Sequence, residues 1–138
     1  MSGWQGYITS LQDANCREAA IVGYNPYSVW ACTPESTVGK ITAAEVATLT
    51  AKERSGMFIN GVTVGGQKCS LIRDNSEVPD DYVMDLKTKS TGGDPTVNIA
   101  IGRTCTALVI CMGEVGTHGG KLNDKAHNMT KYLRGMNL

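Results

Sequence analysis

The sequence has no apolar run that approaches the length of a membrane-spanning helix, which needs about 20 residues. Its first residues, 1–7, lack both the basic start and the apolar stretch of a secretory signal peptide. Neither sign of charge is in excess, because 13 basic residues balance 13 acidic ones. We therefore expect a cytoplasmic protein that recognises any charged partner through a local patch, and we expect no nucleic-acid partner.

Histidine is scarce, and cysteine follows no ligand pattern. The two histidines, His118 and His127, have no partner at metal-ligand spacing, and the five cysteines include no C-x-x-C pair. An odd number of cysteines also argues against a disulfide framework and favours a reducing compartment. We predict neither a metal site nor a cofactor.

No recognisable catalytic motif is present either. The glycine-rich stretch 113–122 superficially resembles a phosphate-binding loop, but Val115 and Leu122 stand where that loop needs a glycine and a serine or threonine. A glycine-rich turn between a strand and a helix is the better interpretation. A small cysteine-dependent enzyme stays open as an alternative, and a cysteine with a depressed pKa and rapid alkylation would reveal it. Otherwise the sequence predicts a protein that binds other proteins and is not an enzyme.

The length of 138 residues, with 41% hydrophobic and 19% charged residues, suits one folded domain over residues 1–138. Apolar residues at steps of three and four predict amphipathic helices over 3–15, with Ser2 as N-cap, and over 122–136, with Gly135 as C-cap. Residues 42–45 fit a capping box and predict another helix that ends near 54–56.

Short apolar segments separated by turn-forming residues predict a series of strands. These segments are 19–23, 28–32, 58–59, 62–64, 67–74, 82–89, 97–102 and 107–112. The first two flank a turn at 24–27 and form a hairpin. Consecutive strands without helices between them indicate an antiparallel sheet. The predicted fold class is α+β, with the N- and C-terminal helices packed on one face of the sheet.

Aromatic residues are few: the chain has two Trp, five Tyr and one Phe. Trp4 and Tyr7 lie three residues apart in the first predicted helix, Trp30 lies on a strand, and Tyr132 lies in the last helix. Large rings with polar N–H or O–H groups suit a half-exposed groove. Such a groove could hold a polyproline II ligand by stacking and by donating to its carbonyl groups. A small aromatic core between the terminal helices fits the spacing equally well.

Several blocks of sequence resemble the profilin family, specifically its vertebrate type. They are GWQGY at 3–7, EAAIVGY at 18–24, NG at 60–61, GQKCS at 66–70, IRD at 72–74, MDLKTKSTGG at 84–93 and HGG at 118–120. The resemblance runs essentially from end to end. It implies a central antiparallel β-sheet flanked by helices, and a protein that binds monomeric actin and, at a second site, proline-rich segments of actin-assembly factors.

Carried over position by position, the polyproline site of the family corresponds to Trp4, Tyr7, Trp30 and Tyr132. Leu138 stands at the end of the chain, where the family often has an aromatic residue. Leucine can pack against proline but offers neither a hydroxyl nor a flat face, so we expect altered affinity or ligand choice.

The resemblance also implies an actin contact, to which twelve residues correspond. They are Phe58, Ile59, Lys68, Ile72, Arg73, Lys87, Lys89, Thr96, Asn98, His118, Gly120 and Asn123. If the strand 67–74 is regular, Lys68 and Ile72 point to one side and Leu71 and Arg73 to the other. The alternative is an ordinary solvated basic surface on a sheet with one wet side.

Five basic residues resemble the phosphoinositide-binding surface of the family, which makes anionic phosphoinositide lipids a further predicted partner. They are Lys68, Lys87, Lys89, Lys131 and Arg134. Two positions depart from the family: Asp124 stands where a lysine is common, and Asn128 where a glutamate is common. We expect weaker or differently tuned actin binding, and the alternative function is a module for proline-rich or phosphoinositide ligands that has lost its actin affinity.

Overall fold

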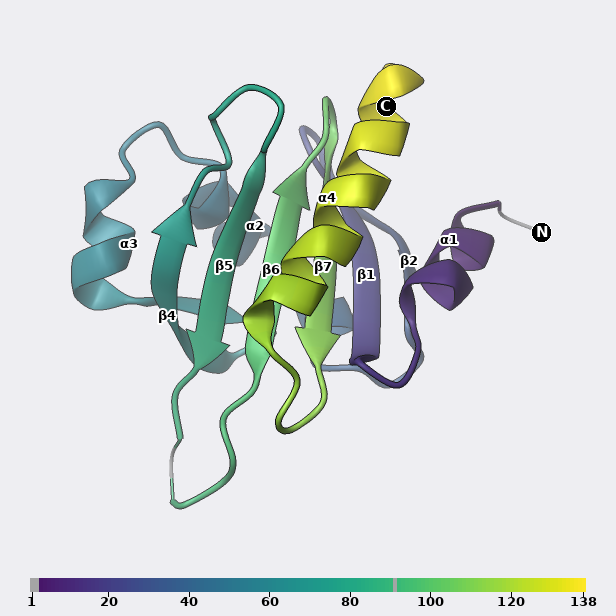
Figure 1. Cartoon of the computed structure of the whole chain (residues 1–138). Helices are drawn as coiled ribbons and strands as arrows, with labels where there is room; N and C mark the ends of the chain where they lie inside the picture. The colour runs from purple at the N-terminus through teal and green to yellow at the C-terminus, as the bar shows by residue number, and fades with distance from the viewer. Residues whose placement is uncertain (1–2, 91) are drawn as a thin grey trace.

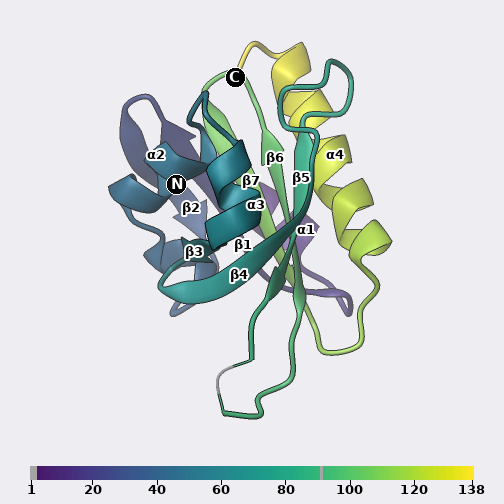
Figure 2. The same ribbon diagram turned by 90° about the vertical axis from the view of Figure 1, so that its left-hand side faces the viewer.

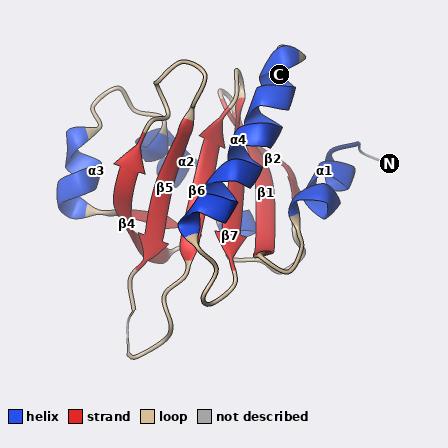
Figure 3. Ribbon diagram, viewed as in Figure 1, coloured by secondary structure: helices blue, strands red, loops and turns tan. Residues whose placement is uncertain are grey.

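The computed structural model describes residues 3–90 and 92–138. The helices are α1 (Gly3–Leu11), the short 3-10 helix η1 (Val38–Lys40), α2 (Ala43–Leu49), α3 (Ser55–Asn60) and α4 (Gly119–Gly135). The strands are β1 (Cys16–Tyr24), β2 (Tyr27–Cys32), β3 (Val62–Val64), β4 (Gln67–Asp74), β5 (Val83–Thr88), β6 (Asn98–Arg103) and β7 (Ala107–Gly113). Within the described residues they form one sheet in the order β2-β1-β7-β6-β5-β4-β3 (Figures 1 and 3). Every neighbouring pair is antiparallel, which confirms the predicted α+β class.

Helices cover both faces of the sheet. Helices α1 and α4 share one face, where Ile8 of α1 and Leu122 and Leu133 of α4 belong to one buried cluster. Helices α2 and α3 lie on the opposite face, and Met57 of α3 joins the other cluster (Figure 2). The prediction that the two terminal helices pack on one face is therefore confirmed. In the described part of the chain, no helix has the length and apolar character needed to cross a bilayer.

The segment 42–60 was only partly predicted correctly. Thr42 forms a capping box, because its Oγ1 accepts from Glu45 N at 3.1 Å and Glu45 Oε1 accepts from Thr42 N at 2.9 Å. The helix ends at Leu49, however, and not near 54–56. The strand predicted at Phe58 and Ile59 is wrong, since both residues lie in α3. Their side chains are 53% and 81% exposed, so this apolar pair does not mark a buried strand.

The capping box gives a first testable prediction. Thr42→Ala removes the acceptor for Glu45 N, and we expect a loss of about 1 kcal/mol in the free energy of unfolding, measured with denaturant. Thr48→Ala is the matched control, because Thr48 donates only to Ala44 O within the same helix. That variant should change stability by less than about 0.5 kcal/mol, and equal losses in the two variants would contradict a role for the cap.

Strand β4 has the predicted bounds but is not regular. Its pairing with β5 shifts between Leu71 and Arg73. The alternation holds up to Leu71, which is buried, but Ile72 and Arg73 are both exposed. The placement of Arg73 on the side of Leu71 is therefore wrong. The irregularity brings Arg73 to the surface, where its Nε lies 3.2 Å from Asp85 Oδ2.

The ends of the other elements differ from prediction by a few residues. The hairpin of β1 and β2 is confirmed, with Tyr24 paired to Tyr27. The first helix ends at Leu11 and not at residue 15, and the predicted N-cap Ser2 lies outside the described residues. Helix α4 includes Gly135 as its last residue, and Met136 is the C-cap.

Candidate functional site

Three elements that are distant in sequence bring four aromatic rings together. Trp4 lies 4.6 Å from Trp30 and 5.3 Å from Tyr7 between ring centroids, and Tyr7 lies 6.0 Å from Tyr132. We call these four residues and Leu138 the aromatic surface, since Leu138 packs against the same buried cluster. The four rings predicted for the polyproline site therefore lie in one region, formed by α1, β2 and the C-terminal part of α4.

The rings are not sealed inside the core. Trp4, Tyr7 and Trp30 are partly exposed, and Tyr132 is 54% exposed. Their inner sides pack on a buried cluster, so the predicted aromatic core and the predicted groove are two sides of the same feature. Gly23 permits this packing, because a Cβ atom there would lie 2.8 Å from Trp30 Nε1.

A cavity of about 440 Å³ continues the aromatic surface between α1 and α4. Tyr7 and Tyr132 line it together with Ser10, Leu11, Lys125, Asn128 and Met129. The pKa of Tyr7 is raised, first because of its hydrogen bond with Tyr132. The Tyr7 phenol therefore stays neutral near pH 7 and can hydrogen-bond a ligand.

The twelve residues predicted for the actin contact lie on α3, β4, β5, β6, the start of α4 and adjoining loops, and we call them the mixed face. Three backbone relations join its strands: Ser70 pairs with Lys87, Lys87 pairs with Asn98, and Lys89 N donates to Lys68 O at 2.8 Å. Figure 1 shows β4 and β5 uncovered beside α4. Apolar side chains stand out between the lysines, because Ile59 and Ile72 are 81% and 59% exposed.

A cavity of about 420 Å³ lies at the centre of the mixed face. Ile72, Arg73, Asn98, Gly120 and Asn123 line it, together with Asp124. Asp85, which the sequence did not single out, organises this cavity: it pairs with Arg73 and accepts from Asn123 Nδ2 at 2.9 Å. The one sequence feature that could have identified Asp85 as a site residue is its position two residues before Lys87, on the same side of the strand.

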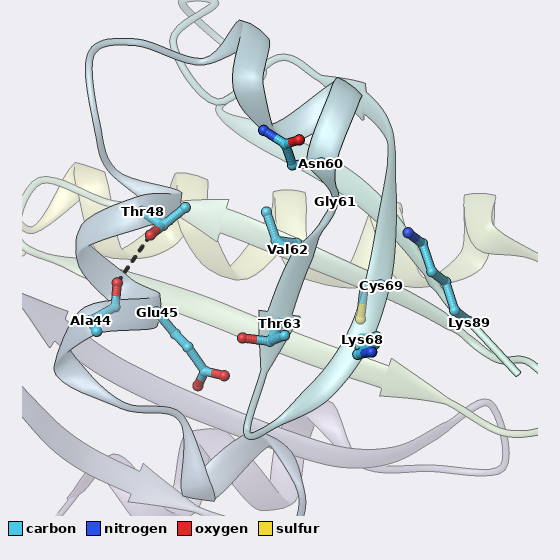
Figure 4. Close-up of a pocket in the computed structure, with 10 residues that line it drawn as sticks. All are labelled: Ala44, Glu45, Thr48, Asn60, Gly61, Val62, Thr63, Lys68, Cys69 and Lys89. Atoms are coloured by element: carbon cyan, nitrogen blue, oxygen red, sulfur yellow. Dashed lines mark hydrogen bonds between the residues drawn. The ribbon is translucent and has the colours of Figure 1, made fainter. Parts of the chain in front are cut away.

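A second cavity, of about 490 Å³, borders the mixed face on the side of α2 (Figure 4). Lys68 and Lys89 line one side, and Glu45 lines the other. The Glu45 carboxylate accepts from Gly65 N at 2.9 Å and from Gly66 N at 3.0 Å, so it holds the turn between β3 and β4. The lysines are therefore the cavity's free charges for a partner.

The cysteine-dependent enzyme gains no support from the structure. Burial raises the pKa of the Cys69 thiol to about 12. The pKa of Cys16 is lowered, chiefly by a hydrogen bond from Cys111, but Cys16 is only 1% exposed. His118 accepts from Gly120 N and His127 contacts Asp80 O, and no hydrogen bond joins a histidine to a cysteine in the described chain.

The five predicted phosphoinositide residues do not form one cluster. Lys68, Lys87 and Lys89 lie together near the Asn98 end of β6. Arg134 instead donates to the carbonyl of Arg103, at the opposite end of the same strand, at 2.8 Å. Lys131 lines a cavity with Arg134 and is likewise separated from the three lysines.

The aromatic surface and the mixed face share no residue, and the edge strands that contribute to them lie at opposite ends of the sheet. Strand β2 carries Trp30 at one edge, and β3 and β4 lie at the other, with four strands between them. This arrangement defines a class of small α+β proteins, in which one antiparallel sheet lies between helices and an aromatic surface forms where the two terminal helices meet.

Comparisons with known proteins place the chain within that class. A family model described as Profilin matches residues 2–138, and the chain belongs to the profilin family. It is 52% identical to Profilin-2 of Rattus norvegicus and 51% identical to Profilin-1 of Mus musculus, over 97% of each chain. Among solved structures, mouse Profilin IIa in complex with a double repeat from the FH1 domain of mDia1 superposes with a TM-score of 0.96 at 48% identity. That match covers 99% of this chain and all of the other.

Proposed function

We propose that this chain is a single-domain, cytoplasmic, cytoskeleton-associated protein that binds monomeric actin and proline-rich segments at the same time and so regulates actin polymerisation. It acts as an adaptor and not as an enzyme. The observation that carries the proposal is the presence of two disjoint surfaces on one sheet of a profilin-family chain. Their separation allows a ternary complex, in which tethering raises the local concentration of actin.

The aromatic surface suits a polyproline II ligand. Neighbouring rings separated by 4.6–6.0 Å offer flat apolar sides for prolines, while indole N–H and phenol O–H groups can donate to the unpaired carbonyls of the ligand. The complex of mouse Profilin IIa with an FH1 repeat supports this site, because the two chains share 48% identity and nearly the same fold. Leu138 supplies an apolar contact without a hydroxyl at one end of the site.

The mixed face suits a protein partner that is partly apolar and partly acidic. Exposed Phe58, Ile59 and Ile72 provide area to bury, and the neighbouring lysines steer the encounter and fix the register. Asp124 lines the cavity on this face and adds negative charge among the basic groups. We propose that Asp124 and Asn128 tune the actin affinity.

Charge reversal at Lys89 tests the actin site. Lys89 is exposed and lies over Gly61, with Nζ about 3.0 Å from the position of a Cβ atom there. We expect Lys89→Glu to weaken actin binding about tenfold in a fluorescence titration with monomeric actin, with unchanged binding of a polyproline peptide. The loss should shrink as salt is raised, because salt screens exposed charges.

The control for this variant is Lys40→Glu, which makes the same charge change at an exposed lysine of η1, outside the mixed face. It should leave actin binding unchanged. If both variants weaken actin equally, net charge and not the mixed face governs binding, and if neither does, the proposed actin contact is wrong.

A phosphoinositide headgroup is a second candidate ligand, favoured by the grouping of Lys68, Lys87 and Lys89. Three exposed ammonium groups on adjacent strands can share one multiply charged phosphate ligand. Co-sedimentation with vesicles that contain a phosphoinositide tests this, and Lys87→Ala should reduce binding whereas Lys131→Ala should not.

A further inference from the structure

A cavity of about 440 Å³ lies between α4, the loop before β5 and the turn from β6 to β7, and none of its lining residues belongs to the aromatic surface or to the mixed face. Its volume is in the range of small-molecule sites, roughly 300–1,000 Å³. The residues that line it include both signs of charge and one thiol: Asp80, Asp81, Cys105, His127, Lys131 and Arg134. Neither the actin site nor the polyproline site uses this cavity.

The charges of the cavity are not paired with one another. No ion pair involves Asp80, Asp81, Lys131 or Arg134 in the described residues. Arg134 is nevertheless held in place, because its guanidinium lies 3.4 Å from the centre of the Tyr82 ring and its Nε donates to Arg103 O. A small ligand that carries both carboxylate and ammonium groups would satisfy these separate charges.

Cys105 is exposed and lines this cavity, so its thiol can be reached by a ligand that binds there. Both backbone polar groups of Cys105 are bound: its N–H donates to Leu138 O at 2.8 Å, and its carbonyl accepts from the Tyr24 hydroxyl at 2.7 Å. Buried Thr104 closes the turn by accepting from Ala107 N. Cys16, Cys69 and Cys111 are buried, and Cys32 is half-buried, so a ligand from solvent meets Cys105 first.

We propose that this cavity binds glutathione and that Cys105 is a site of reversible glutathionylation. The Cys105 thiol releases its proton to solvent, and the thiolate attacks one sulfur of glutathione disulfide. The bond between the two glutathione sulfurs breaks, a mixed disulfide forms at Cys105, and the second glutathione leaves as a thiolate. Lys131 and Arg134 receive the carboxylates of the bound tripeptide, and the aspartates receive its ammonium group.

The test compares a charged and a neutral disulfide as probes on the full chain. Intact-mass measurement follows modification by glutathione disulfide and, separately, by bis(2-hydroxyethyl) disulfide. We expect Lys131→Ala to slow modification by glutathione disulfide about threefold to fivefold and to leave the rate with the neutral disulfide unchanged. Cys105→Ser should abolish the first modification with both probes.

Lys121→Ala is the matched control, since Lys121 is an exposed lysine of the same helix outside the cavity. It should leave both rates unchanged. Equal slowing by the two lysine variants, or no slowing by either, would mean that Cys105 reacts only because it is exposed, and would overturn the proposed binding site. Modification that begins at Cys32 would overturn the assignment to Cys105.

Discussion

Replacing Trp4 with alanine is expected to weaken the binding of a polyproline peptide by about 30-fold or more, as measured by calorimetry. Trp4 is the central ring of the aromatic surface, because it contacts both Trp30, at 4.6 Å, and Tyr7, at 5.3 Å. Its loss removes one stacking surface and leaves two other rings without their neighbour. Aromatic residues at the centre of an interface commonly contribute about 2 kcal/mol or more, which corresponds to this factor.

Phe58→Ala provides the reciprocal control for that experiment. Phe58 is exposed to 53% on the mixed face and lies on α3, outside the aromatic surface. This variant should weaken actin binding and spare the peptide, whereas Trp4→Ala should do the reverse. Parallel losses of both activities in the Trp4 variant, with its unfolding free energy unchanged, would show that the two surfaces are not independent.

The sequence predicted the elements of the aromatic surface but could not decide how open it is. The spacing of Trp4 and Tyr7 specifies a shared side of a helix, and that expectation is confirmed by α1. The exposure of the four rings depends instead on how far α1 and β2 lie from α4. That distance is set by packing between segments about 100 residues apart in sequence. Gly23 contributes to this distance by admitting Trp30, and nothing in its local sequence indicates that contact.

The errors on the mixed face have a similar origin. Regular alternation predicts Arg73 beside Leu71, but the register between β4 and β5 shifts there, and one residue of irregularity moves the side chain to the other face. Phe58 and Ile59 belong to a run of three apolar residues between Gly56 and Asn60, and such a run favours a strand locally. They remain in a helix because Met57, and not either of them, enters the core.

Asp74→Asn is expected to lower the free energy of unfolding by about 3 kcal/mol. Asp74 pairs with Arg54, and the side chains of the two residues are only 7% and 11% exposed. Arg54 also donates to Ala51 O at 2.8 Å, so this pair ties the segment between α2 and α3 to the end of β4. The amide cannot neutralise the buried guanidinium, and removal of one member of a buried ion pair typically costs about 3–5 kcal/mol.

The pH dependence of this variant separates loss of charge from loss of packing. Burial alone would raise the pKa of Asp74, but the hydrogen bonds from Arg54 and Ser76 outweigh it, and the pKa in the folded protein is lowered. The ionised carboxylate therefore makes its full contribution to the free energy of unfolding above the ordinary aspartate pKa of about 3.9. That contribution is lost as the pH falls through the lower pKa that Asp74 has in the folded protein. The stability gap between wild type and Asp74→Asn should be constant near neutral pH and narrow in acid.

Asp85→Asn, at an ion pair whose side chains are 20% and 56% exposed, should cost less than about 1 kcal/mol under the same conditions. A gap for Asp74→Asn that does not change with pH would assign the loss to packing and contradict the proposed role of its charge.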